Sequence, residues 1–340
     1  MNVQQRATLE DVARLAGVSS KTVSRVFTHR DLVAPETVDR VLAAAKRLRF
    51  RPNPLARNLR RGGPTNTIGF IMGELNNPFY YKLAAGIERE LAANGFSLVV
   101  ATTDDTAEGE ERVADALLGQ RLGALLLIPV ADDQSYLEGE RHLGTPIIAI
   151  DRPARNLVAD SIVLQNHRGV FEATTRLLER GHRRIGYICN PASVYTQVER
   201  LRGYRDALAA YGISASSRWE RLADDLARPA DGLIAELLDR DDAPSAIITG
   251  NNRVTINALR VLRDRDDDRT ALIGFDDFDT ADVLGVSVIN YDPIALGKAA
   301  ATLAIERMQD PAGFTRQLEM PTWLVERGTG ERPPAERTPV

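Results

Sequence analysis

From residue 67 onward, short apolar runs alternate with longer helical patterns, and this alternation restricts the possible folds more than any other feature. Strands that are apolar throughout are typical of parallel sheets covered by helices on both faces. The first apolar runs are residues 67–72, 96–103, 123–130 and 145–151, with helical patterns at 77–95 and 111–122. The chain is therefore predicted to contain an α/β lobe with a doubly wound parallel sheet.

The alternation begins again in the second half, which predicts a second lobe of the same kind. Its apolar runs are residues 182–190, 245–250 and 270–278, and its helical patterns lie at 167–181, 199–212, 231–240 and 251–264. Residues 287–293 are predicted as a crossing segment, before a helix at 296–308 and a final strand at 319–328. The lobes are expected at about 66–158 with 292–319, and at about 159–289 with 321–330.

The N-terminal segment has a different pattern, in which two short helices meet at a tight turn. Residues 9–16 place their apolar side chains on one helical face, and Gly17 can end that helix because glycine readily adopts positive φ. Ser19 can cap a second helix, since its hydroxyl can accept a free backbone N–H. The stretch 8–27 is therefore interpreted as a helix-turn-helix.

The second of these helices has an outward face suited to DNA. Ser20, Lys21, Ser24 and Arg25 point outward and supply hydrogen-bond donors and positive charge without any acid. Such a face can reach base edges in the major groove without repulsion from phosphates. The alternative interpretation is an ordinary helical hairpin with a solvated outer face.

The charge distribution favours the DNA interpretation. Residues 1–63 contain 13 Lys and Arg against 5 Asp and Glu, whereas the rest contains 30 against 42. The net charge is thus +8 for residues 1–63, the head, and −12 for residues 64–340, the body, although the net charge of the whole chain is only −4. A basic head on an acidic body fits a polyanionic partner for the head alone.

A third helical pattern and a basic segment complete this N-terminal region. Pro35 begins the third pattern, and Pro52 and Pro54 follow it in the run RPNPLARNLRRGG. From "TLEDVARLAGVSSKTVSRV" to "RPNPLARNLR", the sequence resembles the headpiece and hinge of the lactose-repressor (LacI/GalR) family. The resemblance implies a DNA-binding headpiece over 1–53 and a hinge helix and linker over 54–65.

Residues of the headpiece and hinge are expected to contact DNA. Leu59, within a basic segment, is predicted to enter the minor groove as an apolar wedge. The alternative is that Leu59 packs on the body as a linker anchor. The expected DNA-binding residues are Thr8, Ser19, Ser20, Lys21, Thr22, Ser24, Arg25, Arg57, Leu59 and Arg60.

Polar side chains follow the predicted strands of both lobes, where doubly wound sheets bind ligands. The positions are 76–80, 102–105, 151–152, 250–252 and 275–277. Aromatic faces beside Asp, Asn and Arg groups suit a small polyhydroxyl ligand. Alternatively, each Asp or Asn only caps the helix that follows it.

The body, over about 66–328 within an expected domain of 66–334, also resembles the family's sensor, a type I periplasmic-binding-protein-like domain. The matching pieces are NPFYYKL, AIDRP, ERLRGY, TGNNRVTINAL, LIGFDDF and PTWLVERG. The resemblance implies a ribose- or hexose-type site, with Phe275 stacking on the sugar. The implied effector-binding residues are Phe79, Tyr80, Asp151, Arg152, Arg200, Asn251, Phe275 and Asp276.

Several positions depart from the family's usual residues and leave the effector's identity open. Asn252 stands where an Asp is usual, Gln165 likewise replaces an Asp, and Ile128 lies where ribose binders have a polar amide. Ala34 replaces a usual Ser cap on the third helix. The effector is expected to be a monosaccharide or a related polyol or nucleoside.

No motif of an enzyme or a metal site stands out. The sequence has no GxGxxG after a strand and no GxxxxGK[ST] loop, and its four histidines lack metal-ligand spacing. No cofactor or catalytic residue is expected. The sequence lacks an 18-residue apolar run and a signal-peptide pattern, so a cytoplasmic location is expected. A sugar-binding protein or sugar-processing enzyme without a DNA role is the alternative to a regulator.

The expected mechanism couples two sites in a homodimer. One recognition helix reads too few base pairs, so a dimer on a palindromic operator is expected. Residues 329–340 are polar and proline-rich and are expected to be disordered. The effector would close the lobes and change the order of hinge residues 55–60, but the sequence does not say whether it induces or co-represses.

Overall fold

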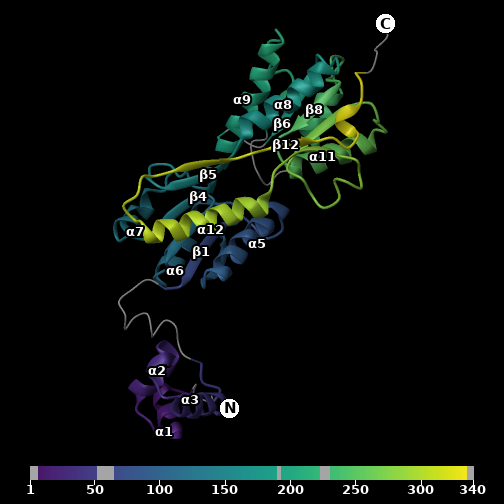
Figure 1. Ribbon diagram of the computed structural model, residues 1–340. Helices are drawn as coiled ribbons and strands as arrows, with labels where there is room; N and C mark the ends of the chain where they lie inside the picture. Colours follow the sequence, from purple (N-terminus) through teal and green to yellow (C-terminus); the bar gives the residue numbers. More distant parts are fainter. Residues whose placement is uncertain (1–6, 52–64, 190–192, 223–229, 335–340) are drawn as a thin grey trace. The chain divides into compact units, whose positions relative to one another are not determined.

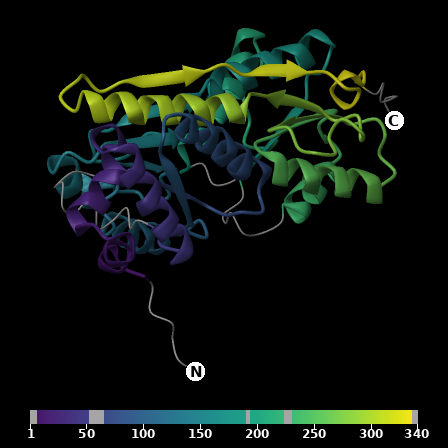
Figure 2. The same ribbon diagram turned by 60° about the horizontal axis from the view of Figure 1, so that its bottom comes forward.

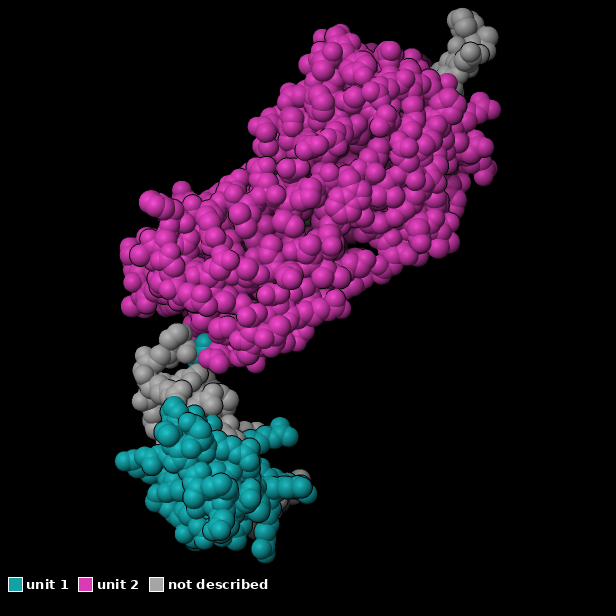
Figure 3. All heavy atoms as spheres, in the orientation of Figure 1, with its two compact units in different colours: residues 1–65 teal, residues 66–340 magenta. Residues whose placement is uncertain are grey.

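The computed structural model describes residues 7–51, 65–189, 193–222 and 230–334. The chain divides into two compact units, Met1–Thr65 and Asn66–Val340, coloured separately in Figure 3. The predicted DNA contacts of Arg57, Leu59 and Arg60 lie outside the described residues, as does most of the expected hinge.

Within its described residues, 7–51, the headpiece contains three α-helices joined by short turns, which are labelled in Figure 1. They are α1 (Leu9–Ala16), α2 (Ser20–Thr28) and α3 (Pro35–Arg47), with a 3-10 turn η1 (Arg30–Leu32) before α3. Gly17 has φ 64° and ends α1 in the left-handed conformation, as expected from its lack of a Cβ. Val12, Val23 and Val41 are fully buried and form the centre of a small core.

The first lobe is built on a six-stranded sheet of order β11-β5-β4-β3-β1-β2, in which every pairing is parallel. Helices cover both faces, which explains why its central strands are buried on both sides. Its elements up to residue 164 are β1 (Thr67–Met72), α5 (Pro78–Ala93), β2 (Ser97–Thr102), α6 (Ala107–Leu118), β3 (Ala124–Leu127), η2 (Ser135–Leu137), α7 (Glu138–His142), β4 (Ile147–Asp151) and β5 (Asp160–Leu164).

The second lobe repeats this plan with a sheet of order β12-β10-β9-β8-β6-β7. Its pairings are parallel except that β12 runs antiparallel to β10. The matched strand orders make β4 and β9 equivalent positions in the two sheets. Its elements up to residue 290 are α8 (Asn166–Glu179), β6 (Ile185–Cys189), α9 (Tyr195–Ala210), β7 (Glu220–Leu222), α10 (Asp231–Leu238), β8 (Ala246–Thr249), α11 (Asn252–Asp264), β9 (Ala271–Phe275) and β10 (Ser287–Asn290).

The C-terminal part of the chain returns to the first lobe and then crosses again. α12 (Pro293–Gln309) packs along α5, and β11 (Gln317–Met320) pairs with β5. β12 (Trp323–Val325) then joins the second sheet, and Figure 2 shows the yellow strands passing from one lobe into the other. Gly86 and Gly297 allow close packing of α5 and α12, because a Cβ at either would lie 2.2 Å from a carbonyl oxygen of the partner helix.

The expected lobe boundaries and strands need four corrections. Residues 160–164 form β5 of the first sheet, so the second lobe does not begin at 159. Residues 220–222 form β7, which was not expected. The expected crossing segment 287–293 contains β10, and only its last residues cross. The expected single strand 319–328 is two strands in different sheets, separated at Pro321, which has no N–H to continue a ladder.

The expectation that residues 329–340 are disordered is wrong for the first residues of this segment. Residues 329–331 form the 3-10 turn η3 (Thr329–Glu331), and Thr329 is buried. The Thr329 hydroxyl donates to the Leu272 carbonyl oxygen at 2.7 Å and accepts from the Ser287 N–H at 2.9 Å. These contacts attach the segment to the second sheet.

Among the described helices, none is long and apolar enough to cross a membrane.

Candidate functional site

The helices of the helix-turn-helix are held by side-chain caps. The Thr8 hydroxyl accepts from the Asp11 N–H at 3.2 Å, and the Asp11 carboxylate accepts from the Thr8 N–H at 2.9 Å, which forms a capping box. The Ser19 hydroxyl accepts from the Thr22 N–H at 3.0 Å. Thr8, Ser19 and Thr22, three of the predicted DNA contacts, therefore fix where the helices begin.

Three of the four residues predicted on the outward face of α2 are exposed. Val23 and Val26 are buried, whereas Ser20, Lys21 and Arg25 are exposed. Ser24 is half-buried, and its carbonyl oxygen accepts from the Thr28 hydroxyl at 3.0 Å. α2 contains no acidic residue, so its exposed polar groups are free to approach an anion.

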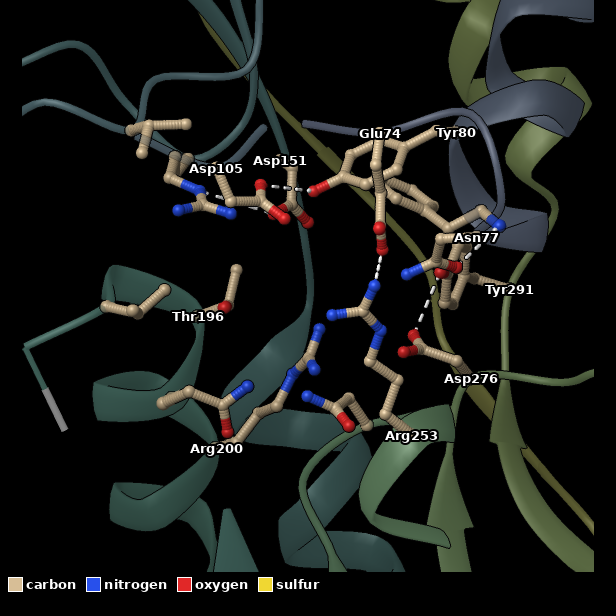
Figure 4. Close-up of a pocket in the computed structure, with 16 residues that line it drawn as sticks. Glu74, Asn77, Tyr80, Asp105, Asp151, Thr196, Arg200, Arg253, Asp276 and Tyr291 are labelled. Atoms are coloured by element: carbon tan, nitrogen blue, oxygen red, sulfur yellow. Dashed lines mark hydrogen bonds and ion pairs between the residues drawn. The ribbon is translucent and has the colours of Figure 1, made fainter. Parts of the chain in front are cut away.

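The second unit contains a pocket between its two lobes, with a cavity volume of about 100 Å³ (Figure 4). Pockets for drug-sized ligands usually measure about 300–1,000 Å³, so this one suits a small molecule. Both lobes contribute side chains, and most of these are polar. The lining residues are Glu74, Asn77, Phe79, Tyr80, Asp105, Val130, Asp151, Arg152, Val194, Thr196, Gln197, Arg200, Asn251, Arg253, Asp276 and Tyr291.

The first lobe presents a group of acids around one arginine. Asp151 ends β4 with a left-handed backbone, φ 69°, and its carboxylate lies 3.5 Å from Arg152 Nε. The Tyr80 hydroxyl donates to Asp105 Oδ1 at 3.3 Å. Burial raises the pKa of Asp105, and the positive charge of Arg152 opposes that rise.

The second lobe presents Arg200 and Asp276, both of which are buried. Arg200 donates to the Asn166 side-chain oxygen at 2.7 Å and to the Gly250 carbonyl oxygen at 2.6 Å. Asp276 accepts from the Tyr291 hydroxyl at 2.9 Å. Burial raises the pKa of Asp276, and the nearby Arg200 guanidinium opposes that rise.

Three buried side-chain atoms of this pocket make no hydrogen bond among the described residues, and one of them, Glu74 Oε1, belongs to an ion pair with Arg253. The other two are Arg152 Nε, a donor that lies 3.5 Å from the Asp151 carboxylate, and Gln197 Oε1, an acceptor. Gln197 is only 3% exposed, so its oxygen lacks the solvent contact that would satisfy it. A ligand hydroxyl both donates and accepts, so it can serve either atom.

Seven of the eight predicted effector-binding residues line the pocket, namely Phe79, Tyr80, Asp151, Arg152, Arg200, Asn251 and Asp276. Phe275 does not line it. Its ring is fully buried, and the Arg200 guanidinium carbon lies 3.5 Å from the ring centroid. The predicted stacking of Phe275 on the sugar is therefore wrong, and the ring supports Arg200 instead. Asn251 also caps α11, because its side-chain oxygen accepts from the Val254 N–H at 2.9 Å.

Nine lining residues were not predicted individually. Asn77 and Asp105 lie inside polar strand-end segments that the sequence had marked, and Glu74 and Arg253 lie just beside such segments. Thr196 and Gln197 come from the first turn of α9, and Tyr291 from the crossing after β10. The other two are Val130 and Val194, which carry no sequence signal of a site. No group of three or more His, Cys, Asp or Glu in the described ranges is arranged to hold a metal ion.

A helix-turn-helix headpiece followed by a two-lobed α/β domain with a polar interlobe pocket is the domain organisation of a DNA-binding transcriptional regulator. Residues 8–53 match the model of bacterial regulatory proteins of the lacI family. Residues 65–303 match the model of periplasmic binding proteins and the sugar-binding domain of the LacI family. The chain belongs to the LacI family of transcriptional repressors.

Relatives along the whole chain agree with this assignment. The ribose operon repressor of Escherichia coli K12 is 31% identical over 329 residues, which cover 95% of this chain and 99% of that protein. The transcriptional regulator CelR in complex with cellobiose is 31% identical to this chain and has a TM-score of 0.70. The match covers 96% of this chain and 100% of the CelR chain. The Lac repressor bound to ONPG is 26% identical to this chain and has a TM-score of 0.84. The match covers 96% of this chain and 100% of the Lac repressor chain. These relatives are regulators and not enzymes.

Proposed function

We propose that the protein represses carbohydrate-utilisation genes in the cytoplasm, by binding a palindromic operator as a homodimer, and that a small sugar-like effector in the interlobe pocket controls this binding. The observation that carries the effector assignment is the convergence of acids and arginines from both lobes on one pocket. Arg152 Nε and Gln197 Oε1, which make no hydrogen bond among the described residues, add a donor and an acceptor there. A monosaccharide or a related polyol or nucleoside supplies hydroxyls for both.

On the DNA side, Lys21 and Arg25 read bases in the major groove, with Ser20 beside them. Their exposure on a helix without acids, in a headpiece and hinge of net charge +8, supports this role. Thr8, Ser19, Thr22 and Ser24 contact the backbone or neighbouring bases. By the family resemblance, Arg57 and Arg60 grip phosphates and Leu59 enters the minor groove.

The dimer follows from the size of the recognition surface. One helix of the length of α2 contacts only a few base pairs, so two copies on a two-fold symmetric site are needed for specificity. Effector binding would change the closure of the lobes and thereby the relation of the two headpieces. This makes the operator and the effector thermodynamically coupled ligands.

The test uses the full-length chain and DNA from upstream of its own gene. Operator selection from a random library, followed by titration at fixed salt, measures the site and the stoichiometry. The titration is repeated with neutral monosaccharides, polyols and nucleosides, while sugar turnover is followed in parallel. We expect a palindromic site, two chains per site, and a change of at least about tenfold in operator affinity with one ligand class, as for typical coupling energies. Turnover of a sugar, or no sequence preference, would overturn the proposal.

A further inference from the structure

Glu74 and Arg253 form an ion pair that spans the pocket. Glu74 follows β1 in the first lobe, and Arg253 lies in the first turn of α11 in the second. Their side chains remain 21% and 42% exposed, so the pair stands at the mouth of the pocket rather than at its base. Beside it, the Asn252 side-chain amide donates to Asn77 Oδ1 at 3.1 Å, which also joins the two lobes.

The position of this pair divides the open part of the pocket. In Figure 4, Glu74 and Arg253 point toward each other, with Asp105 and Asp151 on one side of them and Tyr291 on the other. The remaining cavity of about 100 Å³ lies among these groups. The side chains of the ion pair therefore occupy space that a second sugar ring would need in this pocket.

The charges of the pocket bear on the ligand's own charge. Four carboxyl groups line it against three guanidinium groups. Arg253 is paired with Glu74, and Arg152 lies beside Asp151. Arg200 is held by two oxygen acceptors and the face of Phe275. A phosphate group would therefore meet unbalanced negative charge and no arginine free of an acceptor or an acid.

We propose that the Glu74–Arg253 ion pair closes the pocket over one neutral sugar ring, and thereby excludes disaccharides and sugar phosphates. This inference rests on the proposed function of the same pocket. It makes Glu74 and Arg253 specificity-determining residues, distinct from the groups deeper in the pocket that hold the ring. The relative solved with cellobiose would then differ from this chain in ligand size.

The experiment measures ligand binding to the full-length protein by calorimetry. The probes are ribose, glucose, galactose and fructose as neutral monosaccharides, cellobiose as the disaccharide, and fructose 1-phosphate as the anionic sugar. The variants are Glu74→Gln, Arg253→Gln, the exchange Glu74→Arg with Arg253→Glu, and the double change of both residues to Ala. Melting temperature and operator affinity show whether each variant is folded.

Asp279→Asn is the matched control for an interlobe ion pair outside the pocket mouth. Asp279 accepts from Lys82 Nζ at 2.8 Å and from the Tyr81 hydroxyl at 2.9 Å, and these two residues belong to α5 of the other lobe. Asp279→Asn removes the negative charge from this interlobe contact and leaves the lining of the pocket unchanged, because Asp279 does not line it. We expect Asp279→Asn to keep the wild-type preference among the three ligand classes, whatever it does to affinity.

The wild type is expected to bind at least one monosaccharide and neither of the other two classes. Each Gln variant should bind that monosaccharide about tenfold or more weakly, and the charge exchange should recover most of the loss, as for a charged hydrogen bond. The double Ala variant should gain measurable cellobiose binding. If the wild type binds a monosaccharide and the Gln variants bind it equally well, the inference is overturned while the proposed function stands. The inference is also overturned, while the proposed function stands, if the wild type binds cellobiose or fructose 1-phosphate as tightly as it binds the monosaccharide. If no sugar binds, the sugar effector itself is overturned.

Discussion

Asp151 and Asp276 occupy equivalent positions at the ends of β4 and β9, and both have a left-handed backbone, with φ 69° and 70°. The two residues are 7% and 9% exposed, and both line the same pocket from opposite lobes. Aspartate tolerates this conformation better than most residues, at a modest cost. The repeated sheet plan therefore places the same chemical group on each side of the ligand site.

The first prediction concerns Asp276, whose replacement by Asn keeps the shape and the tolerance of positive φ but removes the charge. Because charged hydrogen bonds are about twice as strong as neutral ones, effector affinity should fall about tenfold or more. Operator affinity without effector should remain unchanged. Calorimetry with the effector and a DNA titration measure the two quantities. Asp268→Asn, on an exposed loop, is the control. Equal effector affinity in both variants would remove Asp276 from the site.

The second prediction concerns pH. Burial raises the pKa values of Asp105 and Asp276 above the usual 3.8, so both carboxyls protonate at a higher pH than exposed aspartates. If ionised carboxylates accept the ligand's hydroxyls, effector affinity is full at neutral pH and falls as pH drops through the raised pKa values. The stability of the unliganded protein responds in the opposite direction, because a raised carboxyl pKa contributes stability at low pH that is lost as pH rises.

Calorimetry at about pH 7 and about pH 5 measures the affinity change, and thermal unfolding measures stability. Asp276→Asn should stabilise the unliganded protein at neutral pH, and this gain should shrink on acidification. It should also reduce the pH dependence of effector binding. An affinity that rises on acidification would contradict the prediction, because the ligand would then favour the protonated carboxyls.

The architecture was largely predictable from the sequence because hydrophobic periodicity reports burial directly. The headpiece helices, the two α/β lobes and seven pocket residues follow from apolar runs, cap residues and family resemblance. β5 escaped detection because its sequence, DSIVL, begins with polar residues that are buried only through tertiary contacts. Asp160 pairs there with Arg307, which lies far along the chain, and no local pattern shows such a partner.

The details of the pocket were less predictable for the same reason. Phe275 ends an apolar strand and therefore looks available for stacking on a ligand, but Arg200 from α9 covers its ring. Glu74 and Arg253 resemble ordinary surface charges in sequence, and their meeting depends on how the lobes approach each other. Pairings between residues distant in sequence require the three-dimensional arrangement.

The third prediction concerns Ala34, which precedes α3 without a side-chain cap. Its backbone, φ −54° and ψ 137°, is close to that of Ser19, which caps α2. Ala34→Ser should therefore stabilise the headpiece by about 1 kcal/mol, because the hydroxyl can accept a free N–H of the first turn. Hydrogen exchange of the α3 amides in the full chain should slow about fivefold, while Ala7→Ser, outside a cap position, should have no effect. Unchanged exchange in Ala34→Ser would show that the cap does not form.

The fourth prediction separates base readout from general attraction to DNA. Arg25 is exposed on the outward face of α2, whereas Arg14 is exposed on α1 beside Asp11. Arg25→Ala and Arg14→Ala remove the same charge from the same unit. A bidentate contact to a base contributes roughly 1–3 kcal/mol of discrimination, so only Arg25→Ala should abolish most of the preference for operator over random DNA.

Titrations of both variants on operator and random DNA, at several salt concentrations, measure this difference. Arg14→Ala should retain the wild-type ratio of specific to nonspecific affinity, even if a lost phosphate interaction weakens both. Effector affinity should be unchanged in both variants, because neither residue belongs to the sensor unit. If Arg25→Ala and Arg14→Ala lost specific and nonspecific binding in equal measure, Arg25 would act only through its charge. The base-reading residues of α2 would then have to be Ser20 and Lys21.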